Sequence, residues 1–381
     1  MTHVTHLPDH PAQTAPWPDR RLLDLFGIVH PILLGPMAGA GTPKLAIAVG
    51  WAGGLASLPG AMYQLDDLRA AIKEVRAGLP GRPLNVNFFC HTPPSADPVR
   101  MMRWRARLAP YYVERGLDPQ ATPPTGGRAP FDAAFCALVE EERPEVVSFH
   151  FGLPDPALLE RVKTTGAKVI SSATTVAEAR WLEARGCDAI IAMGLEAGGH
   201  RATFLGDDVA GDMAGDMSRQ VGTFALVPQV VDAVRVPVIA AGGIADGRGM
   251  AAALTLGASA VQVGTAFLFC PEAKIPAVHR AALEAAGDDG TALTNLFTGR
   301  PARGVMNRVM REVGPLSDDA PPFPLAGGAL APLRAAAEAE GRGDFTNLWA
   351  GQAARLAPRL PAADLTRKLA VDALSRLGPA A

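Results

Sequence analysis

Short apolar segments alternate with longer amphipathic ones from about residue 31 to residue 267. The short segments are almost continuously apolar, and this pattern is typical of parallel strands that are covered on both faces. The segments that predict strands are PILLGP (31–36), GGLASL (53–58), PLNVNFF (83–89), EVVSFHF (145–151), AKVISSA (167–173), DAIIAMG (188–194), PVIAAGG (237–243) and AVQVGTAF (260–267).

Helical patterns lie between most of these strands. The clearest are QLDDLRAAIKEVRAG (64–78), TVAEARWLEARG (175–186) and GRGMAAALTLGA (247–258). Eight strands with intervening helices predict a (β/α)8 TIM barrel with right-handed crossovers. An open doubly wound sheet is the alternative, but the turn after the first strand, GPMAGAGTP, lacks the GxGxxG dinucleotide fingerprint.

Two segments interrupt or follow this repeat. Residues 90–130 hold one helical pattern and a Pro/Gly-rich stretch, which indicates an insertion. Residues 270–381 hold no convincing strand and several Ala-rich helical patterns. We therefore expect an N-terminal extension (1–27), a barrel (28–269) that carries the insertion, and a C-terminal helical cap (270–381) that forms a smaller second domain.

The amino-acid composition and the net charge limit which kinds of fold and binding partner fit this chain. Of the 381 residues 48% are apolar, so a large core can form, and a net charge of −2 argues against a nucleic-acid or anionic-membrane partner. No apolar run is long enough to span a membrane and the N-terminus lacks a signal-peptide pattern, so we expect a soluble, cytoplasmic protein; a homodimer stays open.

Neither the cysteines nor the N-terminal histidines predict a metal site. Cys90, Cys136, Cys187 and Cys270 are scattered without a CxxC spacing, and Cys187 and Cys270 adjoin apolar runs, so buried thiols are expected. The irregular spacing of His3, His6 and His10 among Pro and Asp favours a disordered tail.

The candidate site starts from the stretch DAIIAMGLEAGGH (188–200). It begins as a buried strand and then breaks into Gly194, Gly198 and Gly199 before His200. Glycine lets main chain approach a ligand closely, and histidine binds an anion or moves a proton near neutral pH. The alternative is a glycine-rich turn whose histidine only caps the next helix. Because the C-terminal strand ends of a barrel share one face, residues at the other strand ends join the same pocket.

Glycine turns after the seventh and eighth strands predict a phosphate site. AAGGIADG contains Gly242 and Gly243, and VQVGTAF contains Gln262, Gly264 and Thr265. Main-chain N–H groups at such turns hold the phosphate of a cofactor or sugar phosphate in many barrels. Tight turns that merely require glycine are the alternative. No Walker motif is present.

Other strand ends carry less specific signals. Met37 and Ala38 offer a small apolar surface for a flat ring, and Asn87 can donate and accept at the polar edge of a flavin or nucleobase, or satisfy loop backbone instead. His150 is either catalytic or a hydrogen-bonded structural residue. Tyr111 and Tyr112 reach over the mouth from the insertion or serve an interface. Glu196 is expected to be solvated or to cap a helix.

Together these motifs resemble the nitronate monooxygenase family, formerly called 2-nitropropane dioxygenases. The resemblance covers roughly residues 28–355 and rests on PMAGAGTP, LNVNFF, VVSFHFGLP, GLEAGGHR, PVIAAGGIADGRG and ALTLGASAVQVGTAFL in this order. LAPYYVERGL (108–117) and FTNLWAGQAARLA (345–357) are similar to the class I branch, whose substrate is taken to be propionate 3-nitronate.

The resemblance implies an FMN enzyme that uses O2 to convert alkyl nitronates to a carbonyl compound and nitrite. It places His200 on the substrate side of the flavin and His150 at a second histidine position for which a base role is argued, with Tyr111, Tyr112 and Phe323 at the substrate and no metal. The FMN contacts that it implies are Pro36, Met37, Ala38, Asn87, Met193, Gly198, Gly242, Gly243, Gln262, Val263, Gly264 and Thr265.

Three positions depart from the family pattern, and relatives offer other activities. Met193 stands where the family often has Gln, Ala202 where Gly usually follows AGGHR, and Phe323 where class I members tend to have Tyr. An FMN-dependent NAD(P)H:quinone reductase and an enoyl-acyl-carrier-protein reductase share the barrel and the AGGH motif, and both need a nicotinamide. A non-catalytic barrel that binds a sugar phosphate or a protein partner is the non-enzymatic alternative.

Overall fold

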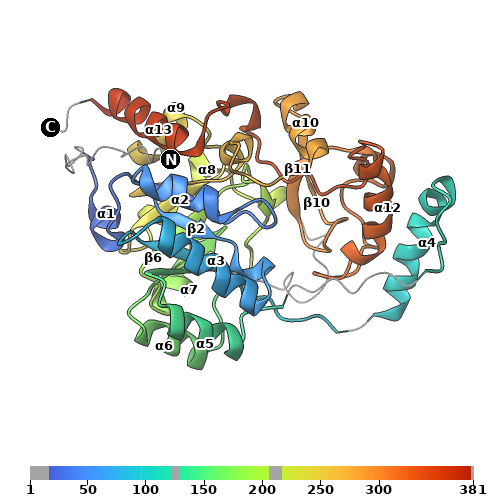
Figure 1. Cartoon of the computed structure of the whole chain (residues 1–381), viewed down its shortest axis with the longest axis horizontal. Helices are drawn as coiled ribbons and strands as arrows, with labels where there is room; N and C mark the ends of the chain where they lie inside the picture. Colours follow the sequence, from blue (N-terminus) through green and yellow to red (C-terminus); the bar gives the residue numbers. More distant parts are fainter. Residues whose placement is uncertain (1–16, 96, 122–128, 206–216, 379–381) are drawn as a thin grey trace, which may run out of the picture.

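The computed structural model describes residues 17–95, 97–121, 129–205 and 217–378, so His3, His6 and His10 lie outside the described residues. Figure 1 shows two parts, a barrel with its surrounding helices on the left and a smaller part on the right, where α12 and α4 lie side by side.

Eight parallel strands form the barrel. Their order is β1-β9-β8-β6-β5-β4-β3-β2, and a bridge between Leu33 and Leu55 links the two end strands. All eight predicted strands are present, which confirms the TIM barrel. Their bounds are β1 Ile32–Leu34, β2 Ala56–Leu58, β3 Leu84–Phe89, β4 Val146–His150, β5 Lys168–Ala173, β6 Ala189–Met193, β8 Val238–Ala241 and β9 Ala260–Val263.

The eighth barrel strand is shorter than the sequence predicts. β9 ends at Val263 rather than at residue 267, because Gly264 leaves the extended conformation with φ −115° and ψ −75°. The chain then turns into the 3-10 helix η4 (Thr265–Phe269), whose apolar residues are buried. An apolar run alone does not separate a strand from a buried helical turn.

Helices surround the barrel, and several begin at caps that the sequence encodes. Thr42, Asp155, Thr175 and Asp246 each accept a hydrogen bond from a first-turn N–H group, which satisfies donors that a helix leaves open. The bounds are α1 Arg21–Phe26, α2 Pro43–Trp51, α3 Leu65–Gly78, α5 Ala133–Glu142, α6 Pro156–Thr164, α7 Val176–Ala184, α8 Thr223–Val231, α9 Gly247–Thr255 and α13 Ala362–Leu377, with short 3-10 turns η1 Gly60–Met62, η3 Met217–Arg219 and η5 Ala354–Leu356.

The smaller part contains strands as well as helices, so the expectation of no strand after residue 270 is wrong. β10 (Thr291–Thr294) and β11 (Ala302–Val305) form an antiparallel pair, and β7 (Gly199–His200) adds to its edge. TALT and ARGV are short and partly polar, so they carry no strand pattern. The helices of this part are α4 Pro98–Glu114, α10 Ala277–Ala285, α11 Arg308–Val313 and α12 Gly327–Ala339.

The last helix belongs with the barrel. α13 packs on α9 and α2, far from α12 in Figure 1. Leu365, Leu369 and Ala373 of α13 are buried in the barrel's hydrophobic cluster. The assignment of all of residues 270–381 to a helical cap therefore does not match how α13 packs.

The insertion contributes one described helix, α4, as predicted, and α4 packs against α12. Trp104 is fully buried and donates from Nε1 to the carbonyl oxygen of Ala326 at 3.0 Å. The Tyr112 hydroxyl donates to the carbonyl oxygen of Ala329 at 2.6 Å. These residues share a second hydrophobic cluster that is separate from the barrel core.

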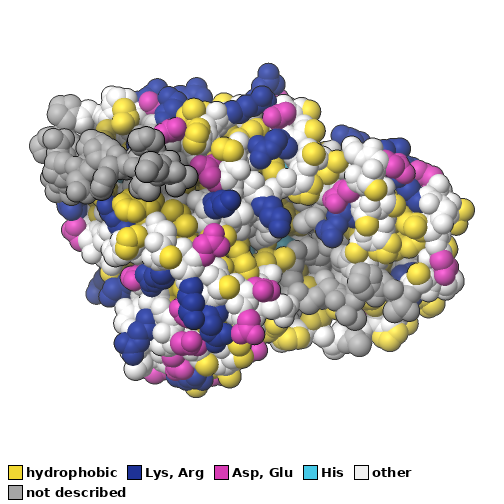
Figure 2. Space-filling view, viewed as in Figure 1, with side chains coloured by type: hydrophobic (Ala, Val, Ile, Leu, Met, Phe, Trp, Pro, Cys, Tyr) yellow, Lys and Arg dark blue, Asp and Glu magenta, His cyan; other side chains and the backbone are white. Residues whose placement is uncertain are grey.

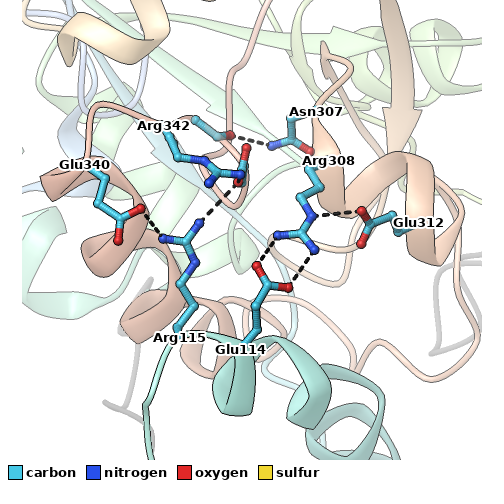
Figure 3. A network of polar contacts seen from close by, with 9 residues as sticks. Glu114, Arg115, Asn307, Arg308, Glu312, Glu340 and Arg342 are labelled. Carbon is cyan, nitrogen blue, oxygen red and sulfur yellow. Dashed lines mark hydrogen bonds and ion pairs between the residues drawn. The ribbon is translucent and has the colours of Figure 1, made fainter.

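Ion pairs extend this contact at the C-terminal end of α4 (Figure 3). Arg308 of α11 makes two hydrogen bonds to Glu114, at 2.6 and 2.7 Å, and one to Glu312. Arg115 contacts Glu340 at 2.7 Å and Asp344 at 3.3 Å. Paired two-point contacts of this kind fix orientation better than single exposed ion pairs.

The cysteines and the helix lengths agree with two further expectations. Cys187 and Cys270 are buried and unpaired, as predicted, and Cys90 and Cys136 are also free thiols. Among the residues described, no helix is both long and apolar enough to cross a membrane.

We predict that Trp104→Ala destabilises the contact between α4 and α12. Removing a buried indole and its hydrogen bond should lower the free energy of unfolding of the smaller part by about 3–5 kcal/mol. Urea unfolding followed by circular dichroism measures the loss. Met102→Ala on the exposed side of the same helix, where Met102 is 63% exposed, should stay within about 0.5 kcal/mol of wild type. Equal losses in both variants would contradict this account of how α4 docks.

Candidate active site

A cavity of about 490 Å³ lies between the C-terminal ends of the barrel strands and the smaller part of the molecule. Figure 2 shows the recess between these two parts. The cavity brings together most of the residues singled out from the sequence. These are Pro36, Met37, Ala38, Asn87, His150, Met193, Gly198, His200, Gly242, Gly243, Gln262, Gly264 and Thr265.

Four of the predicted residues do not line this cavity. Tyr111 and Tyr112 are buried between α4 and the helices of the smaller part, where burial raises the pKa of Tyr111 to about 12. Val263 is fully buried in the barrel core. Phe323 lies just behind the wall, with its ring centre 5.2 Å from that of His200.

Glycine is required where the loop after β6 meets its neighbours. Gly242 has φ 114°, and a Cβ there would lie 2.8 Å from Thr223 Oγ1 and 3.0 Å from the main-chain nitrogen of Ala197. A Cβ on Gly198 would lie 2.5 Å from the nitrogen of Gly351. Side chains are thus excluded, and the loop packs directly against the segment that follows Trp349.

Two amide side chains present acceptors toward the cavity. Asn87 donates from Nδ2 to Ser148 Oγ at 3.0 Å and to the Ser148 carbonyl at 3.2 Å, which leaves its Oδ1 to accept from a ligand. Gln262 Oε1 is buried and has no partner among the described residues. A buried acceptor without a donor is costly, by about 1–3 kcal/mol, so this position fits a ligand that donates.

His200 is fixed in the wall by the small sheet and by a hydroxyl. It pairs with Ala302 across β7 and β11, and its Nε2 lies 3.0 Å from Thr298 Oγ1. The ring of Trp349 lies 5.5 Å away, and the side chain of His200 is 7% exposed. The imidazole therefore lines the cavity in a defined orientation.

His150 supports the main chain of His200 from behind. Its Nε2 lies 3.1 Å from the carbonyl oxygen of His200, and its Nδ1 lies 3.3 Å from Ser172 Oγ. A carbonyl only accepts, so Nε2 carries the proton and Nδ1 accepts from the serine. Burial lowers the pKa of His150 to about 3, so the ring is neutral across the physiological range.

Three buried arginines, which the sequence analysis did not single out, organise the same loop. Arg201 donates to the carbonyl oxygens of Met193 at 2.9 Å and Gly194 at 2.6 Å, at the end of β6. Arg300 donates to the carbonyls of Thr203 and Arg201, and Arg303 donates to that of Leu195 at 2.9 Å. Burial lowers the pKa of Arg201 and of Arg300 to about 10.

Glu196 caps a helix, as expected. Its carboxylate accepts from the main-chain N–H of Thr223 at 2.8 Å and from the Thr223 hydroxyl at 2.7 Å, at the start of α8. Negative charge near a helix N-terminus is favourable. Glu196 therefore has a structural role in the cavity wall, as the cap of α8.

Two of the departures from the family pattern lie together. Met193 and Ala202 form a small apolar cluster with Ala197 beside the cavity. The methyl group of Ala202 is fully buried, so it fills space against Met193 rather than facing a ligand. In the described part of the chain, no group of three His, Cys, Asp or Glu side chains is arranged to hold a metal.

We predict that His150→Gln flattens the pH dependence of stability. The pKa of His150 is depressed in the fold, so its contribution is complete above pH 6.5 and is lost as the pH falls toward 3. Between these limits the free energy of unfolding should fall by up to about 1.4 kcal/mol per pH unit for this one group. Urea unfolding of both proteins between pH 4 and 8 should show a shallower dependence of the unfolding free energy on pH in the variant, and an unchanged slope would refute the neutral assignment.

Comparisons with known proteins agree with this geometry. A family model described as nitronate monooxygenase matches residues 19–372. Proteins named nitronate monooxygenase from Pseudomonas aeruginosa and from Paraburkholderia phytofirmans are each 44% identical to this chain. Both matches cover 92% of this chain, together with 97% and 94% of the respective relative.

Solved structures show the same architecture. A nitroalkane oxidase from Streptomyces ansochromogenes matches with a TM-score of 0.82 and 40% identity, covering 93% of this chain and 97% of that one. FabK from Thermotoga maritima matches with a TM-score of 0.67 and 32% identity over 93% and 95% of the two chains. By its near full-length match to the family model and by its relatives, the chain belongs to the nitronate monooxygenase family and is an oxidoreductase.

Proposed function

We propose that this enzyme uses FMN and O2 to oxidise alkyl nitronates, such as propionate 3-nitronate, to a carbonyl compound and nitrite. The observation that carries the proposal is the position of His200, a fixed imidazole on the wall of a cavity that glycine-rich strand ends also line. The relatives that bear the names nitronate monooxygenase and nitroalkane oxidase support the reaction type.

The groups on the barrel side of the cavity fit FMN. The unsatisfied Gln262 Oε1 and the open Asn87 Oδ1 suit the N–H and hydroxyl donors of a flavin and its ribityl chain. The turns after β8 and β9 offer main-chain N–H groups for the phosphate. The residues proposed to hold FMN are Pro36, Met37, Ala38, Asn87, Met193, Gly198, Gly242, Gly243, Gln262, Gly264 and Thr265.

The protein's own task is to bind and orient an anion. A nitronate is already a carbanion, so no strong base is needed to begin the reaction. When bound, FMN supplies the redox centre that accepts electrons from the nitronate and passes them to O2. His200, protonated or as an N–H donor, holds the nitronate, while Thr298 fixes the plane of its ring.

Neighbouring residues keep the binding position dry and fixed. Phe89, Phe151 and Phe323 form an apolar cluster against the His200 ring, and this cluster excludes water. Excluding water strengthens the attraction between the imidazole and an anion. In this scheme neutral His150 acts as a positioning residue, because both of its ring nitrogens already have partners.

We predict that His200→Asn lowers kcat/KM for nitronate oxidation by about 100-fold, because the neutral amide cannot carry the positive charge of a protonated imidazole and has no ring nitrogen for Thr298 to orient. Thr298→Val keeps the imidazole and removes only the hydroxyl that orients it, so a loss of only about tenfold is expected from this variant. Steady-state oxygen consumption measures both. Unchanged kinetics in His200→Asn would show that the assignment to His200 is wrong.

A second prediction separates oxidase from reductase chemistry. Nitronate added without oxygen should bleach the bound flavin within the time of turnover, whereas NADH and NADPH should leave it oxidised. The physical reason is that the proposed site holds a small anion at His200 and needs no nicotinamide. Stopped-flow absorbance measures both reactions, and fast bleaching by NADPH would favour the reductase alternative instead.

A further inference from the structure

A tryptophan lines the cavity beside His200, and the proposed binding of FMN and of the nitronate does not use it. Trp349 lies in the stretch FTNLWAGQAARLA (345–357), which resembles the class I branch. It is partly buried, and its ring centre lies 5.5 Å from that of His200. An indole is therefore next to the imidazole that is proposed to hold the anion.

Contacts to both parts of the molecule fix the main chain around Trp349. Its carbonyl oxygen accepts from Nε2 of His279 in α10 at 3.0 Å, and the next N–H but one, that of Gly351, donates to Thr265 Oγ1 in η4 at 2.9 Å. Trp349 also forms a β-bridge with Gly304 of β11, where a Cβ would lie 3.2 Å from the indole Cε3. The ring is thus held in place before a ligand arrives, which lowers the entropic cost of binding.

The indole N–H of Trp349 is not used by the protein. Within the described part of the chain, no atom accepts a hydrogen bond from its Nε1, whereas Trp51 and Trp104 donate to the carbonyl oxygens of Gly78 and Ala326. The Nε1 atom is not sealed from solvent, and its residue lines the cavity. Because a tryptophan N–H in a largely enclosed position normally finds an acceptor, this position suits a ligand that accepts.

We propose that Trp349 donates its indole N–H to the substrate, and that Trp349 and His200 together form a two-donor site for a planar anion with two oxygens on one nitrogen. A nitronate has two such oxygens, and each donor then binds one of them. The inference rests on the proposed nitronate oxidation and adds a second substrate-binding residue to that site. Hydrogen bonds to a charged acceptor are stronger than neutral ones, so the loss of this donor is measurable in binding.

Two donors on fixed rings distinguish anions by shape as well as by charge. Contacts at two points add geometric specificity to the attraction that one donor supplies. Nitrate carries its oxygens in one plane around nitrogen, as the nitronate group does, whereas chloride is a single sphere and gains little from a second donor. The pair therefore favours nitrate over chloride more strongly than His200 alone would.

The test is Trp349→Phe in the holoenzyme, with nitrate and chloride as the probes. Phenylalanine keeps an aromatic ring against His200 and removes the N–H. Calorimetric titration should show nitrate binding weakened by about tenfold, while chloride binding, measured by its competition with nitrate, stays within about twofold of wild type. In steady-state oxygen consumption, kcat/KM for a nitronate should fall by about the same factor as nitrate binding, mainly through KM.

Trp51→Phe is the matched control, since Trp51 is an exposed indole on α2 and does not line the cavity. It should leave nitrate binding and nitronate kinetics unchanged. Unchanged nitrate binding in Trp349→Phe, equal losses for nitrate and chloride, or no nitrate binding by wild type would overturn the inference. So would loss of bound flavin from Trp349→Phe, because the indole would then hold the cofactor. The proposed function fails separately if wild type oxidises no nitronate while nitrate binding still depends on Trp349.

Discussion

The site depends on buried guanidinium groups that hydrogen-bond to main-chain carbonyls. Arg201 is completely buried and donates to the carbonyl oxygens of Met193 and Gly194 where β6 ends, which fixes the start of the loop that carries His200. A buried charge is tolerated only when its donors are satisfied, and here carbonyl oxygens do this instead of carboxylates. Arg300 and Arg303 do the same from the other side.

This arrangement joins the two parts of the molecule beside the cavity. Arg201 belongs to the barrel loop, whereas Arg300 precedes β11 and Arg303 lies within it, in the smaller part. Arg300 also lies over the ring of Phe151, with its guanidinium carbon 3.9 Å from the ring centre. The same few contacts thus fix the loop that contains His200 and position the ring of Phe151 beside it. The α4 contacts lie far from this point and stabilise the smaller part on its outer side.

The barrel could be predicted from the sequence because its strands are buried on both faces, and so each appears as an apolar run between helices. The glycine-rich strand ends were likewise recognisable, because only glycine suits the close packing at positions such as Gly242. The short strands β10 and β11 could not be found in this way. Their residues are partly polar, and the two strands are defined by pairing: β10 pairs with β11, and β11 also pairs with β7 and, at Gly304, with Trp349.

The sequence also did not show which side chains, far apart along the chain, lie together in the fold. Tyr111 and Tyr112 stood out as candidates for the mouth, yet they pack inside the smaller part. The position of Arg201 directly after His200 was a local signal in the sequence. Its hydrogen bonds to main-chain carbonyls could not be predicted from any sequence pattern.

The two-residue strand β7 has a consequence for how the family can vary. Its pairing with Ala302 and Arg303 decides which side of the chain His200 faces, since neighbouring residues of a strand point to opposite sides. A one-residue shift in this register would break the pairing that holds His200 at the cavity wall, while leaving the barrel strands intact. Length changes should therefore be tolerated in the outer helices, whereas the number of residues between Gly299 and Arg303 should stay constant.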